Sequence, residues 1–192
     1  MATVITTLTL IASPNAMAQT QALLLDDFSD TGTNAAFGTR WQPFSDRVMG
    51  GVSDMQVRYA SEAGETFLQM SGSVRLDNNG GFIQVRLPLE SNRGPLDASG
   101  FAGVAIRVRG QPGQWFIHLR TPNARRPWQY YRAELPVGPD WQRHVIEFSN
   151  FRGQSIDTEL DLERLSSIAV VAYGQAFEAE IEIARLELVP KR

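Results

Sequence analysis

The sequence predicts an all-β fold, a jelly-roll-like β-sandwich. Three observations favour this class. Apolar and polar residues alternate with a period of two along most of the chain, turn signals rich in glycine, asparagine and proline separate the alternating segments, and no long helical segments come between them. Alternation places successive side chains on opposite faces of a strand, so each strand has one face for a core and one for solvent. Many short strands without intervening helices are typical of two antiparallel sheets packed together.

The alternation defines eight strands, and one short segment at 157–165 is expected to be helical for a turn or two. In one strand, for example, Ile83, Val85 and Leu87 share a face. The predicted strands are 67–76, 81–87, 103–109, 115–120, 128–135, 141–148, 168–172 and 178–189. The apolar residues expected in the core include Val104, Ile106, Trp115, Ile117, Leu119, Ile181 and Ile183.

The last strand changes phase. Ile181 and Ile183 share one parity, whereas Leu186 and Leu188 share the other. An extra residue in one strand of a pair restores the side-chain direction, so a β-bulge near Ala184 would keep all four on the core face.

Composition sets limits on function. The 192 residues suit one domain, at 23–190, and the absence of cysteine excludes disulfides, thiol catalysis and cysteine-ligated metals. Only His118 and His144 are present, so a zinc site with three histidines is also excluded. A net charge of −3 argues against nucleic-acid binding. We therefore expect neither a metal nor a cofactor.

The amino terminus resembles a secretory signal. Residues 1–18 carry no charge, include an apolar stretch from Val4 to Ala12, and end in the small-x-small pattern Ala16-Met17-Ala18. The apolar stretch is too short to span a bilayer. We expect cleavage after Ala18 and a periplasmic or otherwise exported protein without a membrane span. The positively charged start of such signals is absent, so a cytoplasmic or matrix-equivalent location remains the alternative if residues 1–18 are not a signal.

The segment 46–53, with the sequence DRVMGGVS, is the first candidate binding element. Its paired glycines would let backbone N–H groups approach a ligand closely, and Arg47, Gly50, Gly51 and Ser53 are the candidate contacts. A tight corner entering a strand is the alternative interpretation, in which Gly50 and Gly51 have positive φ angles that a Cβ disfavours and Arg47 pairs with an acid or a carbonyl.

A second glycine-rich segment, 78–81, has the sequence NNGG. Asparagine and glycine both tolerate positive φ angles, so this segment is predicted to be a hairpin turn.

One sheet face is the second candidate binding surface. The residues opposite the apolar set on two predicted strands are Phe116, His118, Arg120, Trp128, Tyr130 and Arg132. Aromatic rings and arginine donors on one face suit sugars or other polar ring ligands, with His118, Arg120, Trp128, Tyr130 and Arg132 as the candidate contacts. Arg125 and Arg126 would add positive potential. A solvated face with incidental aromatic residues is the alternative.

Catalytic patterns are weak. No Gly-x-Ser-x-Gly elbow or dinucleotide-binding fingerprint is present, and His144 shares its parity with Ile146 and Phe148, as expected of a histidine at the edge of the core. We predict that the protein is not an enzyme.

The order of several short segments resembles one known family. These segments are Asp27-Phe28, Trp41, 46–53, 72–74, 78–86, 101–104, 107–110, 119–121, Trp141 and 148–151. Together they resemble the complex I intermediate-associated protein 30 family over residues 26–188. The resemblance implies a galactose-binding-like jelly-roll β-sandwich, no catalytic residues and, as in mitochondrial members, a chaperone-like role in assembling respiratory complex I.

Two functions follow from these observations. The first is a non-catalytic, chaperone-like module that binds another protein, such as a subunit of a membrane complex. The alternative is an exported, lectin-like module that binds a glycan or small polar ligand on the aromatic and arginine-bearing face.

Overall fold

The structure is a computed structural model that describes residues 21–30, 34–92 and 94–191. The expected signal segment and its cleavage site after Ala18 lie outside the described residues. Among the residues described, no helix has the length and apolar character needed to cross a membrane.

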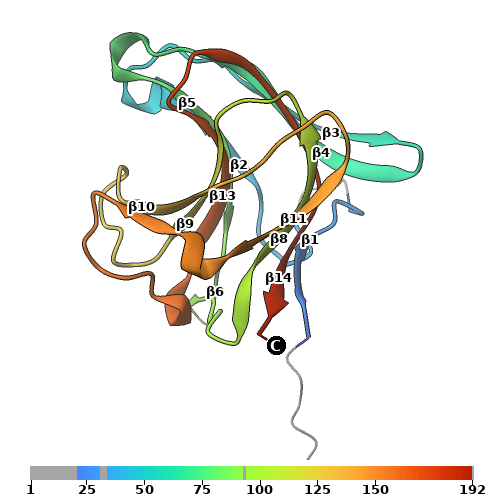
Figure 1. The fold of residues 1–192 in the computed structure, drawn as a ribbon, viewed down its shortest axis with the longest axis vertical. Helices are drawn as coiled ribbons and strands as arrows, with labels where there is room; N and C mark the ends of the chain where they lie inside the picture. Colours follow the sequence, from blue (N-terminus) through green and yellow to red (C-terminus); the bar gives the residue numbers. More distant parts are fainter. Residues whose placement is uncertain (1–20, 31–33, 93, 192) are drawn as a thin grey trace, which may run out of the picture.

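Two six-stranded antiparallel sheets pack face to face (Figure 1). Sheet A has the order β11 (Gln142–Glu147), β8 (Phe101–Gly110), β14 (Phe177–Pro190), β4 (Glu65–Val74) and β3 (Gln56–Glu62), with β1 (Leu23–Asp26) also paired to β14. Sheet B has the order β12 (Arg152–Gln154), β10 (Tyr130–Glu134), β9 (Trp115–Arg120), β13 (Ser167–Tyr173), β5 (Phe82–Pro88) and β2 (Gln42–Ser45). A small ribbon pairs β6 (Glu90–Ser91) with β7 (Gly94–Pro95). This arrangement confirms the predicted jelly-roll β-sandwich.

The eight predicted strands are all present, with ends within two residues of those expected. The strands that alternation did not indicate have two to four residues, except β3, which has seven. Strand β2 contains Pro43, which an edge strand tolerates because its outer N–H groups need no partner. The expected helical segment contains a single turn of 3-10 helix, η4 (Leu162–Arg164).

The predicted bulge is confirmed in β14. Ile183 pairs with Val108, but Arg185 pairs with the next residue along β8, Arg107, so Ala184 is the extra residue. The four apolar residues on either side of it are all fully buried, as expected: Ile181, Ile183, Leu186 and Leu188.

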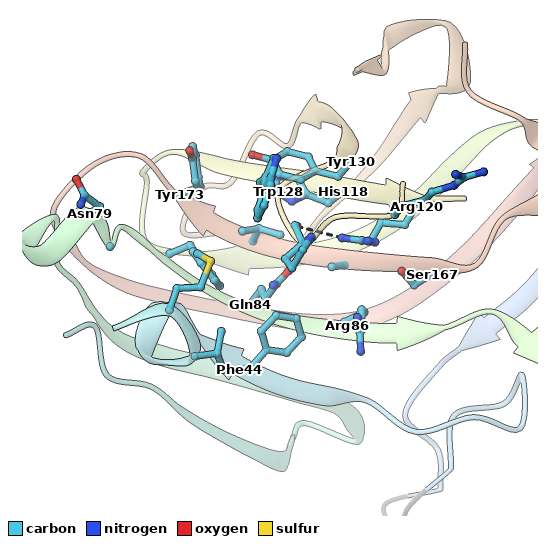
Figure 2. A pocket seen from close by; sticks show the side chains of 18 residues that line it. Phe44, Asn79, Gln84, Arg86, His118, Arg120, Trp128, Tyr130, Ser167 and Tyr173 are labelled. Carbon is cyan, nitrogen blue, oxygen red and sulfur yellow. Dashed lines mark hydrogen bonds between the residues drawn. The ribbon is translucent and has the colours of Figure 1, made fainter. Parts of the chain in front are cut away.

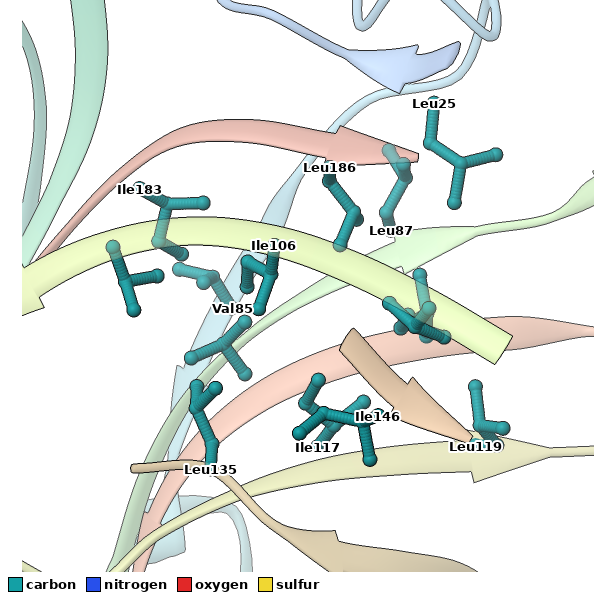
Figure 3. Packing of buried hydrophobic residues seen from close by; sticks show 14 of the residues in the cluster. Leu25, Val85, Leu87, Ile106, Ile117, Leu119, Leu135, Ile146, Ile183 and Leu186 are labelled. Carbon is teal, nitrogen blue, oxygen red and sulfur yellow. The ribbon is translucent and has the colours of Figure 1, made fainter. Parts of the chain in front are cut away.

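The core lies between the sheets (Figure 3). The seven residues expected there are each at most 2% exposed, and Ile106 from sheet A and Ile117 from sheet B belong to the same apolar cluster. Each sheet therefore has an inner face in this core and an outer face that carries the remaining side chains.

The hairpin prediction for 78–81 is wrong. The segment follows β4 in sheet A and leads into β5 in sheet B, and these two strands do not pair. Asn78, Asn79 and Gly81 do have positive φ, at 57°, 57° and 124°. The residue types correctly indicated a tight turn. A tight turn can connect strands of two different sheets as well as the two strands of a hairpin.

Candidate functional site

The two glycine-rich segments meet at one buried carboxylate, Asp46. This residue begins a 3-10 turn, η1 (Asp46–Met49), and its side chain is fully buried. Its Oδ2 accepts a 2.6 Å hydrogen bond from the Ser53 hydroxyl and another from the Gly81 N–H, while Oδ1 accepts from the Ser53 N–H at 3.0 Å. Asp46 therefore ties the 46–53 segment to the turn at 78–81.

The hydrogen bonds also set the charge state of this carboxyl group. Burial alone would raise the pKa of Asp46, but hydrogen bonds from Ser53, Gly81 and Phe82 stabilise the charged form and leave the pKa below its usual value. Asp46 is therefore a charged anchor for the loop at neutral pH.

The glycines around Asp46 have two different roles. Gly50 ends η1 with a φ of 90°, a conformation that disfavours a Cβ. Gly51 is not in that conformation, but a Cβ there would overlap the Asp46 carboxyl group, and the same holds for Gly80. Gly51 is thus required by close approach, and the expectation of a positive φ at this position is wrong.

The 46–53 segment supports the site without lining it. Arg47 donates from Nε to the Ser53 carbonyl at 2.9 Å, the kind of carbonyl pairing expected for a corner, and Ser53 is bonded to Asp46. None of the four candidates Arg47, Gly50, Gly51 and Ser53 lines the groove described next. Their neighbours Val48 and Met49 do.

A groove of about 350 Å³ lies on the outer face of sheet B (Figure 2). Its floor is formed by β5, β13, β9 and β10. One wall is η1, which contributes Val48 and Met49, and the other is the loop 121–129, which contributes Trp128. Figure 2 shows His118, Trp128 and Tyr130 grouped on one side and Phe44, Gln84 and Arg86 on the other.

Small side chains on the middle strand create the depression. Ala169 of β13 pairs with His118 of β9 on one side and with Arg86 of β5 on the other. Val171 lies two residues further along the same face. The small side chains of β13 thus lie between larger side chains on β9 and β5, and the difference in size leaves room above β13.

His118 is a buried polar residue of the floor. It is 8% exposed, and its ring stacks on that of Tyr130 with centroids 3.9 Å apart. Burial, reinforced by the positive charges of Arg132 and Arg120, lowers the pKa of His118 to about 3, so the ring is neutral at physiological pH. Its Nε2 atom has no hydrogen-bond partner among the described residues.

Tyr130 shares this environment. Burial and the neighbouring Tyr173 hydroxyl raise the pKa of Tyr130 to about 12, so the phenol also stays neutral. The stacked pair therefore presents aromatic surface and uncharged polar atoms to the groove.

Arg120 holds one wall of the groove in place. Its guanidinium donates to the carbonyls of Ala124, Pro127 and Arg126 at 2.6, 3.0 and 3.1 Å. The sequence predicted Arg120 as a ligand contact only. The structure instead makes Arg120 an anchor of the 121–129 loop that also lines the groove.

The other two predicted contacts differ in position. Trp128 lines the groove from the loop, since β10 begins only at Tyr130, and its side chain is 56% exposed. Arg132 does not line this groove, because its guanidinium lies over the Phe116 and Tyr173 rings, at 4.8 and 5.9 Å from their centroids.

Several groove residues were missed by the sequence analysis, above all Gln84, Arg86, Ser167 and Tyr173. Their parity did place Gln84 and Arg86 on the outer face. What the sequence did not provide was the strand order, which puts β5 and β13 beside β9 although they are far apart along the chain.

Arg86 is the notable omission. It donates to the Gln42 side chain at 2.6 Å and lies over the Phe44 ring, but its buried Nε has no hydrogen-bond partner among the described residues.

The two-sheet jelly roll is similar to the fold of galactose-binding-like carbohydrate-binding modules. The fold is similar to that of the family 11 carbohydrate-binding module of a Clostridium thermocellum cellulosomal cellulase, with a TM-score of 0.68 and 16% identity over 88% of this chain and 95% of that one. A complex of the family 11 module from Clostridium thermocellum with a β-1,3-1,4-mixed-linked tetrasaccharide gives a TM-score of 0.66 and 16% identity, covering 89% and 97%.

Part of an exo-β-agarase is also similar, with a TM-score of 0.57 and 9% identity over 88% of this chain but 26% of that chain. These likenesses concern the fold alone.

Sequence comparison identifies the family. Residues 28–183 match Complex I intermediate-associated protein 30, and the chain belongs to this family, as its motifs suggested. A search of curated proteins found no match.

Proposed function

We propose that this protein is a non-catalytic binding module and that its ligand is a carbohydrate, held in the groove on sheet B. The observation that carries the proposal is His118, a neutral, buried imidazole against the groove whose Nε2 has no hydrogen-bond partner among the described residues. Buried polar atoms are nearly always hydrogen-bonded, so an unpaired one beside a groove favours a ligand that supplies the missing bond.

Sugars match the chemistry of this surface. A neutral imidazole has one donor and one acceptor nitrogen, and a sugar hydroxyl can pair with either. Trp128 adds a large, accessible ring at the rim, and aromatic rings give apolar contact to the C–H face of a sugar. The groove volume also lies within the range of small-molecule sites.

The same residues argue against catalysis. A histidine with a pKa near 3 is a poor general base at neutral pH. Among the described residues that line the groove, none is an aspartate or glutamate that could serve instead. This supports a site that binds without transforming its ligand.

A protein partner is the second candidate, and a separate observation favours it. Val48, Met49 and Trp128 are 70%, 53% and 56% exposed and together line the mouth of the groove. Exposed apolar side chains gathered in one place are common in protein interfaces. The family to which the chain belongs is named for association with complex I intermediates, so an apolar segment of a membrane-complex subunit is the partner this candidate implies.

Calorimetric titration with a panel of neutral and acidic oligosaccharides tests the main proposal. Trp128→Ala should weaken binding at least about tenfold, because it removes the large aromatic ring that a sugar would contact. Val145→Ala is the matched control, since Val145 is an exposed apolar residue on β11 of sheet A. The proposal fails if no saccharide binds, or if Trp128→Ala binds as well as Val145→Ala. Capture of a membrane-complex subunit that Met49→Ser abolishes would then support the protein partner.

A further inference from the structure

The groove is positively charged although the protein as a whole is negative. Its lining includes Arg86, Arg120 and Arg125, and none of its described lining residues is acidic. The chain carries a net charge of −3. Positive charge is therefore concentrated where a ligand would lie, and a groove with low-dielectric walls strengthens such a field.

The three arginines are held without carboxylate partners. Arg86 bonds the Gln42 amide and Arg120 bonds backbone carbonyls, whereas the Arg125 side chain makes no hydrogen bond or ion pair with the described residues. Neutral acceptors orient a guanidinium but leave its charge uncompensated. Arginine forms its strongest bonds, often as a two-pronged fork, with carboxylate or another oxyanion.

Two of these charges act on one another. Burial lowers the pKa of Arg120, and the positive charge of Arg86 lowers it further. Ser167 lies between them: it pairs with Arg120 on β9, and its neighbour two residues along, Ala169, pairs with Arg86 on β5. Figure 2 shows Arg86, Ser167 and Arg120 together at one end of the groove, away from Asn79 and Tyr173. An anion at this end would relieve the repulsion between like charges.

We infer that the groove selects acidic glycans, with a carboxylate or sulfate of the sugar seated between Arg86 and Arg120 above Ser167. The inference rests on the proposed function and specifies its ligand class. The sugar ring then lies toward Trp128 and Tyr130, which provide the apolar contact, while Arg86 and Arg120 bind the charged group.

A pair of ligands that differ only in charge tests this inference. Trigalacturonate and its fully methyl-esterified form have the same sugar rings, but only the first carries carboxylates. A sulfated disaccharide with its unsulfated parent forms a second pair that distinguishes the two kinds of oxyanion. Calorimetric titration should show that at least one charged ligand binds at least about tenfold more tightly than its neutral partner, the usual advantage of a hydrogen bond to a charged group. The difference should shrink as salt is raised.

Substitutions test which arginines bind the charged group of the ligand. Arg86→Gln should remove most of the preference for the charged ligand, and Arg125→Gln should reduce it at unchanged melting temperature, because Arg125 is exposed. Arg58→Gln on β3 of sheet A is the matched control, since it makes the same charge change on the opposite sheet.

The outcomes separate the inference from the function on which it rests. If each charged ligand and its neutral partner bind equally well and Trp128→Ala abolishes binding, acidic selectivity is overturned and the carbohydrate site stands. The inference is equally overturned if Arg58→Gln weakens charged-ligand binding as much as the two groove substitutions do. If neither member of either pair binds, and the neutral oligosaccharides of the panel fail as well, the proposed function itself is wrong.

Discussion

The two outer faces of the sandwich are both rich in arginine, but they use it differently. On sheet A, four arginines pair with carboxylates: Arg107 with Glu65 at 2.7 Å, Arg109 with Glu62 and Glu182, and both Arg143 and Arg185 with Glu187. A fifth, Arg58, bonds the Gln69 amide oxygen. On sheet B, the groove arginines bond to amide or carbonyl oxygens or to no described residue.

Two tryptophans, one beside each sheet, differ in the same way. Trp141 beside sheet A lies under the guanidinium groups of Arg107 and Arg109, at 5.1 and 4.7 Å from the ring centroid. Both of these arginines are also ion-paired with glutamates. Trp128 beside sheet B is exposed at the rim of the groove.

The difference shows that charge content does not identify a binding face. What separates the faces is whether the polar groups are already satisfied within the protein. The outer face of sheet A pairs most of its arginines with carboxylates, whereas the outer face of sheet B leaves Arg86 Nε and His118 Nε2 without partners among the described residues. His144 Nε2 of sheet A is also unpaired, but His144 shares the side of β11 on which Ile146 is buried. A face with unsatisfied groups gains more from a ligand, because the ligand supplies bonds that the folded chain lacks.

The largest effect is expected at the anchor of the groove wall. Asp46→Asn replaces an acceptor oxygen with an amide donor that faces the Ser53 hydroxyl and the Gly81 N–H, so we expect a loss of about 3 kcal/mol of unfolding free energy. Urea denaturation at neutral pH measures it. Asp77→Asn, in an exposed ion pair with Arg75, is the control and should cost less than about 1 kcal/mol.

The effect of Asp46→Asn on stability should also depend on pH. Because folding lowers the pKa of Asp46, its charged form contributes stability that is fully present above the unfolded pKa of about 4 and is lost as pH falls through the lower folded pKa. The stability gap between wild type and Asp46→Asn should therefore narrow as the pH is lowered below about 4. A constant gap across this range would contradict the role assigned to the charge.

An intermediate effect should separate the two faces directly. Glu187→Gln on sheet A leaves Arg143 and Arg185 without their shared carboxylate, which is largely buried, and should cost about 1–2 kcal/mol of unfolding free energy. Arg125→Gln, in the 121–129 loop beside sheet B, breaks no ion pair among the described residues and should change stability by less than about 0.5 kcal/mol. Thermal melts of both proteins provide the measurement. Equal losses would remove the distinction between a paired and an unpaired face.

The smallest effect concerns the loop wall. Arg120→Gln removes donors from three carbonyls of the 121–129 loop, and we expect a cost of about 1 kcal/mol and faster amide exchange within that loop. Arg126→Gln, an exposed residue of the same loop, is the control. If hydrogen exchange is unchanged in Arg120→Gln, the guanidinium does not anchor the loop, and Arg120 is free to act as a ligand contact alone.

The candidate site was predictable only in part. His118, Arg120, Trp128 and Tyr130 were identified because two strands adjacent in the chain, β9 and β10, are also adjacent in the sheet. Arg132 shares their face but lies outside the groove, over Phe116 and Tyr173, and no local pattern distinguishes it.

By itself, the sequence determined which face of each of the eight predicted strands lies in the core, and even the bulge at Ala184. Side-chain direction follows from a local period of two, and apolar residues must leave water. Only the tertiary structure decided which outer faces lie side by side. The order β10-β9-β13-β5 brings Arg86 opposite Ala169 and near Arg120, and Asp46 bonds to Gly81 across 35 positions of the chain. Alternation fixes where each side chain points but says nothing of strand order, so the groove and its unpaired charges arise only when distant strands assemble.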